Sequence, residues 1–342
     1  MPRTSPTGLN RSRVAPLHVA GIDAWSSLCS TAYVPLATVA APDFRGSMHE
    51  TRVGDASVSQ VGSTAATIQR GRPRVRTDPR EALILSIFLT GGGTVLQGTR
   101  PVRVTAGTGY LLESDRPYSV RFDQPYDMLA LRLPTEHTGL DHRVLADLTG
   151  RPIGPAVPEL GVLRGHLAQL VDAPPADDAV AAEHAVLAEL LAALAHRLRH
   201  PERPLARLSN DALVVHAQWY LLRHHADASF GVDDLARAYG VSRRHLEIVF
   251  TRRGAGPGAH LRTLRLRRAS QLLAADRELT VAAAARQAGF GEVNTFIRAF
   301  RRQWETTPDD WRRSRSDVVV PLRPPADELL TDLSRLTWTR AS

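Results

Sequence analysis

Two segments in the last third of this 342-residue chain repeat one local plan: a short helix, a glycine turn and a second helix. In the first copy, residues 232–239 begin a helix, and Gly240 permits a sharp turn. Ser242 can then cap a second helix over 243–253. The residues that share its inward face, at i, i+3, i+4 spacing, are Leu246, Val249 and Phe250. The segment therefore predicts a helix-turn-helix motif.

The second copy follows 49 residues later, with Gly291 at the position that matches Ser242. Thr280 can cap a helix over 281–288, and a second helix covers 292–304. Its turn and its inward face are formed by Gly289, Phe296, Ile297 and Phe300. The chain therefore carries two predicted helix-turn-helix motifs in tandem.

The positive charge of the chain is concentrated around these motifs. Of the formal net charge of +8, the whole excess lies in residues 201–315, which hold 20 arginines against 12 acidic residues. Such a local basic field suits a polyanionic partner, although a solvated basic surface would give the same count. A long helix over 257–275 joins the motifs, so their second helices would lie at a fixed offset. Two adjacent major grooves on one DNA face, about 34 Å apart, require such an offset.

Residues 213–313 resemble the DNA-binding domain of the AraC/XylS family of bacterial transcription regulators. The resemblance rests on Leu235-Ala236, Gly240 to Leu246, Phe250, Arg265 to Ala269, Leu272-Leu273, Ala288 to Phe290, Phe296, Arg298, Phe300 to Arg302, Thr307-Pro308 and Trp311-Arg312. The chain departs from the family pattern where Glu305 replaces a usual Gly, where Asn294-Thr295 replaces Ser-Tyr, and where Gly291 replaces a Ser-like cap.

The resemblance implies which residues meet DNA. Arg244 and Glu247 match base-reading positions of the first recognition helix, and Arg243 is expected at bases or phosphate. In the second recognition helix, the residues that match the base-reading positions are Val293, Asn294 and Arg298. An intramolecular salt bridge is the alternative role for Arg298. Arg301 and Arg302 are expected to hold phosphates, which position a protein without specifying sequence. The full set of expected DNA-contacting residues is Ser242, Arg243, Arg244, Glu247, Gly291, Glu292, Val293, Asn294, Arg298, Arg301 and Arg302.

Residues 47–133 have a different character, with short β-forming runs between turn signals. These runs are Ala56–Val61, Ala82–Leu89, Thr94–Gln97, Val102–Val104, Gly109–Leu112, Ser119–Phe122 and Met128–Leu133. Many short strands at close spacing predict an antiparallel β-barrel or sandwich.

The same region resembles the cupin-type ligand-binding domain that often precedes this DNA-binding domain. The matching runs are Phe44 to Ser47, Gly91 to Thr94, Gly107 to Gly109, Arg116 to Tyr118 and Leu131 to Pro134. The resemblance implies a barrel that holds one small organic effector. The candidate effector-binding residues are Arg72, Arg74, Phe88, Tyr110, Tyr118 and Arg121. Alternatively, the arginines between residues 70 and 80 form a solvated charge run.

A cupin metalloenzyme is the alternative from another functional class. Such enzymes need histidine and glutamate ligands that converge from neighbouring strands. Between residues 47 and 133 the only histidine is His49, and Glu113 alone cannot hold a metal. The chain also has no Gly-x-Ser-x-Gly elbow, P-loop or Cys/His pair. We therefore expect no enzymatic activity, no metal and no cofactor.

Two predicted helices, 159–171 and 178–198, form a helical hairpin after the barrel. The second carries one leucine stripe, formed by Leu187, Leu190, Leu191, Leu194 and Leu198. The stripe either packs on the barrel or forms the seam of a homodimer.

The composition indicates a cytoplasmic protein that is not inserted in a membrane. The single cysteine, Cys29, excludes an internal disulfide. Residues 1–14 lack the apolar core of a signal peptide, and apolar stretches such as 185–195 fall short of the roughly 20 residues that span a bilayer.

The predicted fold is a two-domain α+β protein, with an antiparallel β-barrel followed by an all-α tandem helix-turn-helix domain. The expected segments are a flexible N-terminus (1–24), an effector-binding barrel (25–138), the hairpin and a linker (139–203), the DNA-binding domain (204–315) and a tail (316–342). The expected function is an effector-responsive transcription activator that binds double-stranded DNA as a homodimer and contacts RNA polymerase. The alternative is a regulator whose barrel senses nothing and which a protein partner controls.

Overall fold

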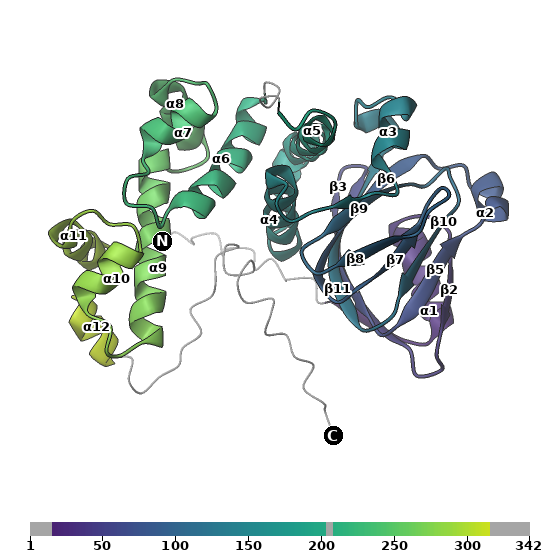
Figure 1. The fold of residues 1–342 in the computed structure, drawn as a ribbon, viewed down its shortest axis with the longest axis horizontal. Helices are drawn as coiled ribbons and strands as arrows, with labels where there is room; N and C mark the ends of the chain where they lie inside the picture. The colour runs from purple at the N-terminus through teal and green to yellow at the C-terminus, as the bar shows by residue number, and fades with distance from the viewer. Residues whose placement is uncertain (1–15, 203–207, 315–342) are drawn as a thin grey trace, which may run out of the picture. The chain divides into compact units, whose positions relative to one another are not determined.

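A computed structural model describes residues 16–202 and 208–314 of the chain. The expected tail and most of the expected flexible N-terminus lie outside these residues. The chain divides into two compact units, with the boundary between Ala195 and His196 (Figure 1).

The first unit is built on two antiparallel sheets (Figure 1). The seven-stranded sheet contains, in spatial order, β1 (Leu17–Ala20), β3 (Arg45–Val53), β4 (Ala56–Ser63), β11 (Tyr126–Pro134), β6 (Ala82–Thr90), β9 (Gly109–Glu113) and β12 (Pro152–Ile153). The five-stranded sheet contains β2 (Ala37–Ala40), β5 (Ala66–Arg70), β10 (Tyr118–Phe122), β7 (Gly92–Leu96) and β8 (Val102–Thr105). The antiparallel β architecture is confirmed, although the strands form two sheets rather than one closed barrel.

The two sheets share one apolar core. Phe88 of β6 and Met128 of β11 belong to the same buried cluster as Ile68 and Phe122 of the other sheet. Trp25 of helix α1 (Ile22–Ala32) is fully buried in this cluster. Residue 46 must be glycine here, because a Cβ at Gly46 would lie 2.4 Å from the indole ring of Trp25.

The remaining helices of this unit follow the strands or interrupt them. They are α2 (Arg72–Thr77), η1 (Thr135–His137), α3 (His142–Leu148), α4 (Pro158–Asp172), η2 (Asp177–Ala179) and α5 (Val180–Arg199). Helix α4 packs on β3, β4 and β11 of the seven-stranded sheet. The predicted helical hairpin corresponds to α4 and α5.

The leucine stripe lies on α5. Leu187, Leu190, Leu191 and Leu194 are each at most 1% exposed, and Leu198 is half-buried. Burial within one chain favours the packing interpretation over a dimer seam. The segment Asp177–Arg199 also has the length and composition of a membrane span, which the shorter apolar run 185–195 did not suggest. These buried leucines are equally characteristic of a core helix.

The second unit is all-helical. Its helices are α6 (Asn210–His224), α7 (Val232–Ala238), α8 (Arg243–Arg252), α9 (Pro257–Ala275), α10 (Val281–Gln287), α11 (Val293–Trp304) and α12 (Pro308–Ser314). Helix α9 runs along the unit, with α7 and α8 toward one end and α10 to α12 toward the other (Figure 1). Both predicted helix-turn-helix motifs are therefore present.

Helix α9 supplies side chains to two separate cores. Leu261 and Leu264 pack with α6, α7 and α8, in a cluster that includes Phe250. Leu266 and Leu273 pack with α10, α11 and α12, in a cluster that includes Phe300. One continuous helix is thus a structural member of both motifs, which sets the offset between them.

Candidate nucleic-acid interface

Local capping fixes where the first recognition helix, α8, begins. The Ser242 hydroxyl accepts a hydrogen bond from the backbone N–H of His245 at 3.1 Å. Gly240 adopts a positive φ of 62° in the preceding turn. The inward face of α8, with Leu246, Val249 and Phe250, is buried as predicted.

Three side chains of α8 are exposed at or near its N-terminus. Arg243 is exposed but forms an ion pair with Asp233 of α7, at 3.1 Å. Arg244 is exposed, and no ion pair of it is found in residues 16–202 and 208–314. Ile248 is 44% exposed. It is not among the expected DNA-contacting residues, and its exposure on the same helix as Arg243 and Arg244 is the signal that marks it.

Glu247 lies differently from its expected base-reading position. Its side chain is half-buried, and a Cβ at Gly256 would lie only 2.6 Å from the Glu247 Oε2. Gly256 directly precedes the first residue of α9, Pro257. The Glu247 carboxylate is therefore drawn to the positive N-terminal end of α9. This placement was not predictable from the spacing of α8 alone.

The second recognition helix, α11, begins one residue later than expected. Its N-cap is Glu292, in an extended conformation, rather than Gly291. The Glu292 carboxylate accepts a hydrogen bond from the Thr295 hydroxyl at 3.3 Å, which holds the first turn. Gly291 and Glu292 are both exposed.

The outer face of α11 carries the other expected DNA-contacting residues. Asn294, Arg298, Arg301 and Arg302 are exposed, whereas Val293 is half-buried. In the part of the chain that the structure describes, no intramolecular salt bridge of Arg298 occurs, so that alternative role has no support. The inward face, with Phe296 and Phe300, is fully buried.

Arg265 of α9 holds the loop between α6 and α7, against which the second motif also packs. It donates from Nε to the carbonyl of His225 and from Nη2 to those of Asp227 and Phe230, each at 2.8 Å. These carbonyls belong to the loop between α6 and α7. Gly289, in the turn of the second motif, lies against the same loop, because a Cβ there would be 2.2 Å from the His225 oxygen. The turn of the second motif therefore packs against the loop between α6 and α7, which belongs to the first motif.

A hydrogen-bonded pair, buried at His216 and half-buried at Tyr239, links α6 to the end of α7. The Nδ1 atom of His216 in α6 lies 2.6 Å from the hydroxyl of Tyr239, which follows α7. Burial and, to a smaller extent, the nearby charge of Arg197 together lower the pKa of His216 to about 4. The ring is thus neutral at physiological pH.

A cavity of about 40 Å³ lies between the sheets of the first unit. Tyr110 and Tyr118 line it, whereas Phe88 lies beside it, with its ring 6.1 Å from that of Tyr110. The other residues that line it are Cys29, Tyr33, Leu36, Val61, Ile68, Ile84, Ser86, Leu112, Val120, Phe122, Tyr126, Met128 and Ala130.

The three arginines expected at the effector site are not in this cavity. Arg72 and Arg74 are exposed on helix α2, so the alternative of a solvated charge run is the better description. Arg121 is 62% exposed and pairs with Asp123 at 2.9 Å. It points outward because alternate residues of β10, Tyr118 and Val120, face the core. As cavity-lining residues these three predictions are wrong.

Sequence reasoning missed Arg70, which is fully buried. Its three nitrogens donate to the backbone carbonyls of Ser114, Pro35 and Asp78 at 2.5 to 2.7 Å. The side chain therefore ties three loops together. Its position in a run of arginines hid this structural role.

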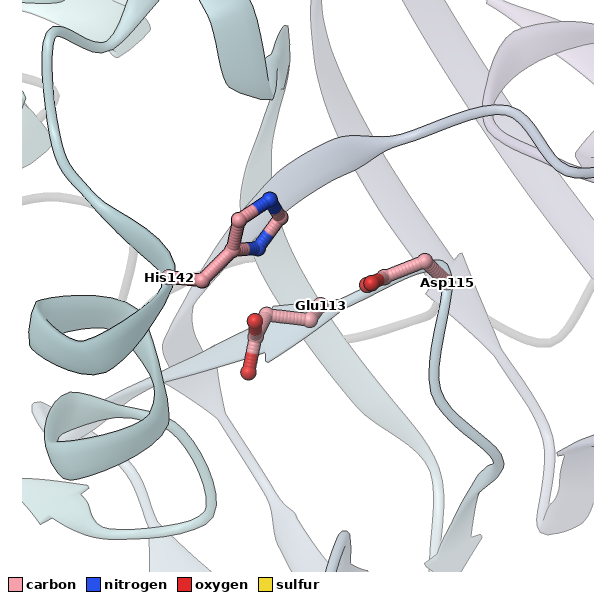
Figure 2. A group of neighbouring side chains, drawn as sticks. All are labelled: Glu113, Asp115 and His142. Carbon is pink, nitrogen blue, oxygen red and sulfur yellow. The ribbon is translucent and has the colours of Figure 1, made fainter.

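Glu113 also has neighbours that sequence reasoning did not find. Figure 2 shows it beside Asp115 and His142, and ligand atoms of the three lie within 4.8 Å of one another. His142 comes from α3, outside the β-rich residues 47–133. However, Glu113 already pairs with Arg116 at 2.7 Å and accepts from the Thr149 hydroxyl at 3.1 Å. The guanidinium opposes a cation at this position, and we assign no metal site here.

Comparison with known proteins finds a matching domain family for each of the two units. A helix-turn-helix domain family matches residues 235–314, and an AraC-binding-like domain family matches residues 25–199. The transcriptional activator NphR of Rhodococcus sp. is 25% identical over 270 residues, which cover 78% of this chain and 80% of that protein.

Two further matches cover different extents of the chain. The right origin-binding protein of Escherichia coli is 32% identical over 105 residues, or 30% of this chain and 36% of that protein. The crystal structure of the AraC-like transcriptional activator CuxR covers 80% of this chain and all of its own, with 14% identity and a TM-score of 0.47.

Proposed function

The chain belongs to the AraC/XylS family of DNA-binding transcription regulators, and from this premise we propose how its residues perform that function. Helices α8 and α11 enter two successive major grooves on one face of the DNA. The observation that carries this proposal is the sharing of α9 between both motif cores, through Leu264 on one side and Leu266 on the other. A helix built into both cores keeps the recognition helices in phase with the duplex.

Base reading is assigned to side chains on the outer faces of α8 and α11. Arg244 and Arg298 suit guanine and Asn294 suits adenine, since each can form two hydrogen bonds to those base edges, worth ~1–3 kcal/mol of discrimination each. Ile248 and Val293 suit the methyl group of thymine. Glu247, held at the start of α9, would support the geometry of α8 rather than read a base.

Phosphate contacts are assigned to the remaining residues of the expected set. Arg301 and Arg302 lie exposed in the last turn of α11. Arg243 reaches DNA after exchanging Asp233 for a phosphate, which an exposed ion pair permits at little cost. Ser242, Gly291 and Glu292 lie where the recognition helices begin, and their backbone approaches the phosphates.

The first unit is proposed as the sensor. Small-ligand sites are concave and mostly apolar, as this cavity is. An effector that binds there changes DNA binding only if its affinity differs between the two states. We assign the sensor to residues 25–138, a connecting region to 139–203 and DNA binding to 204–315. The relative NphR is named a transcriptional activator, which supports the same direction of control for this chain. We propose that this chain activates transcription by contact with RNA polymerase.

Three further assignments complete the proposal. The protein acts in the cytoplasm, where its DNA target lies, and as a homodimer. We place the dimer seam away from the leucine stripe of α5, because burial of that stripe within one chain favours its packing role. It is a regulator rather than an enzyme, since its family consists of regulators.

Genome-wide footprinting tests the proposal. The bound sites should share two conserved half-sites about one helical turn, or roughly 10 base pairs, apart. Sites that share a single half-site, or no common sequence, would contradict it.

A further inference from the structure

A strong local positive charge surrounds helix α2 of the first unit. Residues 70–80 hold five arginines against one aspartate, whereas residues 1–200 together hold 20 arginines against 19 acidic residues. Helix α2 lies at the edge of this unit, beside the two sheets (Figure 1). The segment is therefore a local basic surface on a unit whose total charge is nearly neutral.

Three arginines of α2 have no counter-charge in the free protein. Arg72, Arg74 and Arg76 are all exposed, and none of them forms an ion pair within residues 16–202 and 208–314. The single aspartate of the segment, Asp78, is paired with Arg80 at 2.7 Å. The three side chains can therefore bind an anion without breaking an ion pair.

The buried Arg70 fixes the segment that contains α2 at both of its ends. Arg70 lies two residues before the helix, and its Nη2 atom donates to the carbonyl of Asp78, the residue that follows the helix, at 2.5 Å. Its Nε and Nη1 atoms donate to the carbonyls of Ser114 and Pro35, each at 2.7 Å. Helix α2 is therefore held in a fixed position on the first unit.

The spacing of the three arginines is unfavourable for the helix itself. Arg72 and Arg76 are four residues apart, so they share one face of α2, where like charges are destabilising. Arg74 is two residues from each and lies on a different side, because an α-helix turns once every 3.6 residues. Local conflicts of this kind are typical of functional surfaces, and a bound polyanion would relieve the repulsion.

This surface suits an extended polyanion better than a small anion or a protein. Arginines on different sides of a helix do not converge on one small anion. The centre of a protein interface is rich in apolar side chains, but none of the exposed large apolar side chains of the described residues lies on α2.

DNA is the polyanion that the chain already holds. A duplex carries one phosphate per roughly 1.7 Å, and phosphate contacts need charge without an apolar anchor. Because the second unit binds DNA, the phosphates of that duplex stay at a high local concentration around the first unit of the same chain.

We propose that α2 is an additional DNA contact of this chain, in which Arg72, Arg74 and Arg76 bind phosphates of the duplex that the second unit holds. The proposal rests on the DNA-binding function proposed for that unit above. The α2 contacts strengthen binding without specifying sequence, because phosphates are the same at every base pair.

The combined replacement Arg72→Ala, Arg74→Ala and Arg76→Ala in the full-length protein tests the proposal. Affinity for a footprinted target with its natural flanking DNA is measured by fluorescence anisotropy at several salt concentrations. The variant should bind at least about tenfold more weakly at roughly 0.1 M salt, and the slope of log affinity against log salt should become shallower by about two to three. Its preference among single-base variants of the target should not change.

A second triple variant controls for the change in total charge. Arg100→Ala, Arg143→Ala and Arg151→Ala together remove the same charge from exposed positions elsewhere in the first unit. This variant should change the salt slope by less than about one, because it removes no phosphate contact.

A third variant separates the charge of α2 from its fold. Arg72→Lys, Arg74→Lys and Arg76→Lys together keep the charge and should keep the salt slope of the wild type, since lysine also binds phosphate as a point charge. The melting temperature of the α2 alanine variant should not fall, because the replaced side chains form no ion pair and two of them repel each other.

The proposal is overturned if the α2 alanine variant keeps the affinity and the salt slope of the wild type, or if both triple-alanine variants lose affinity equally. Unchanged DNA binding with weaker transcription in vitro would also overturn it, and would assign α2 to a protein partner. Specific DNA binding by the wild type with no effect of the α2 variant rejects only the α2 contact. Absence of specific binding by the wild type rejects the proposed function itself.

Discussion

Arg265 of α9 donates a hydrogen bond from its Nε atom to the backbone carbonyl of His225, at 2.8 Å. The helix that joins the two motifs is thereby fixed to the loop that follows α6. Burial lowers the pKa of Arg265, but the guanidinium remains charged because its usual pKa lies so high. Hydrogen bonds from a charged donor to three carbonyls hold this loop more firmly than neutral ones would.

Replacing Arg265 with alanine should weaken the attachment of α9 to the loop between α6 and α7. Two part-buried carbonyls and one exposed carbonyl would lose this donor, and we expect a loss of about 1–3 kcal/mol in the free energy of unfolding. Urea unfolding followed by circular dichroism measures it. Arg262→Ala, at an exposed position on the same helix, is the control and should change stability by less than about 0.5 kcal/mol. Equal effects of the two variants would show that the Arg265 contacts add nothing.

Replacing Glu305, which ends α11, with glycine should stabilise the folded protein. It adopts a left-handed conformation, with φ 57°, and is the only non-glycine residue of the described chain with positive φ. Glu305→Gly should raise the free energy of unfolding by about 1 kcal/mol, because glycine adopts this conformation without the Cβ strain. Glu305→Ala keeps the strain and should not stabilise. Thermal unfolding of both variants provides the test, and stabilisation by alanine alone would point to the carboxylate instead.

The buried His216 should make the DNA-binding unit sensitive to acid. Its pKa is about 4 in the folded protein and about 6.5 in the unfolded chain. Below pH 6.5 the unfolded chain therefore binds more protons, and the free energy of unfolding falls as the pH is lowered toward 4. The expected loss between pH 7 and pH 5 is about 2 kcal/mol.

Comparison with His216→Gln isolates this contribution, because glutamine does not titrate. The variant should lack that part of the pH dependence when urea unfolding is measured at pH 7 and pH 5. A wild type and variant with parallel pH profiles would show that His216 is protonated equally in both states.

Replacing Arg244 with alanine and replacing Arg301 with alanine should impair DNA binding in different ways. Arg244→Ala should lose ~1–3 kcal/mol of discrimination at one base pair, because it removes a base contact. Arg301→Ala should weaken binding to all sequences and reduce the salt-dependence slope by about one. Fluorescence anisotropy on a set of single-base variants, at several salt concentrations, separates the two. Uniform weakening by Arg244→Ala would refute its base-reading role.

Much of the second unit was predictable because its signals are local. The caps Ser242 and Thr280, the turn glycines and the bounds of α9 all depend on residues within a few positions of one another. Strands in seven β-rich runs were predicted for the same reason. Strand β3 was not, because its few strand-favouring residues, such as Met48 and Val53, alternate with polar and charged ones, and its pairing with β4 forms it.

The features that escaped prediction depend on distant parts of the chain. The satisfied guanidinium of Arg70 depends on loops more than 30 residues away in two directions. The placement of Glu247 depends on where α9 begins. Whether Arg121 faces the cavity depends on the register of β10 between β5 and β7. Composition and spacing carry none of this information.

The central claim is that α9 holds α8 and α11 at one fixed offset, and the spacing of the DNA half-sites tests it most directly. Insertion of five base pairs between the half-sites of a footprinted target turns one groove by about half a helical turn. The account predicts that affinity for the stretched site, measured by fluorescence anisotropy, falls to that of a single half-site. Undiminished affinity for the stretched site would contradict it.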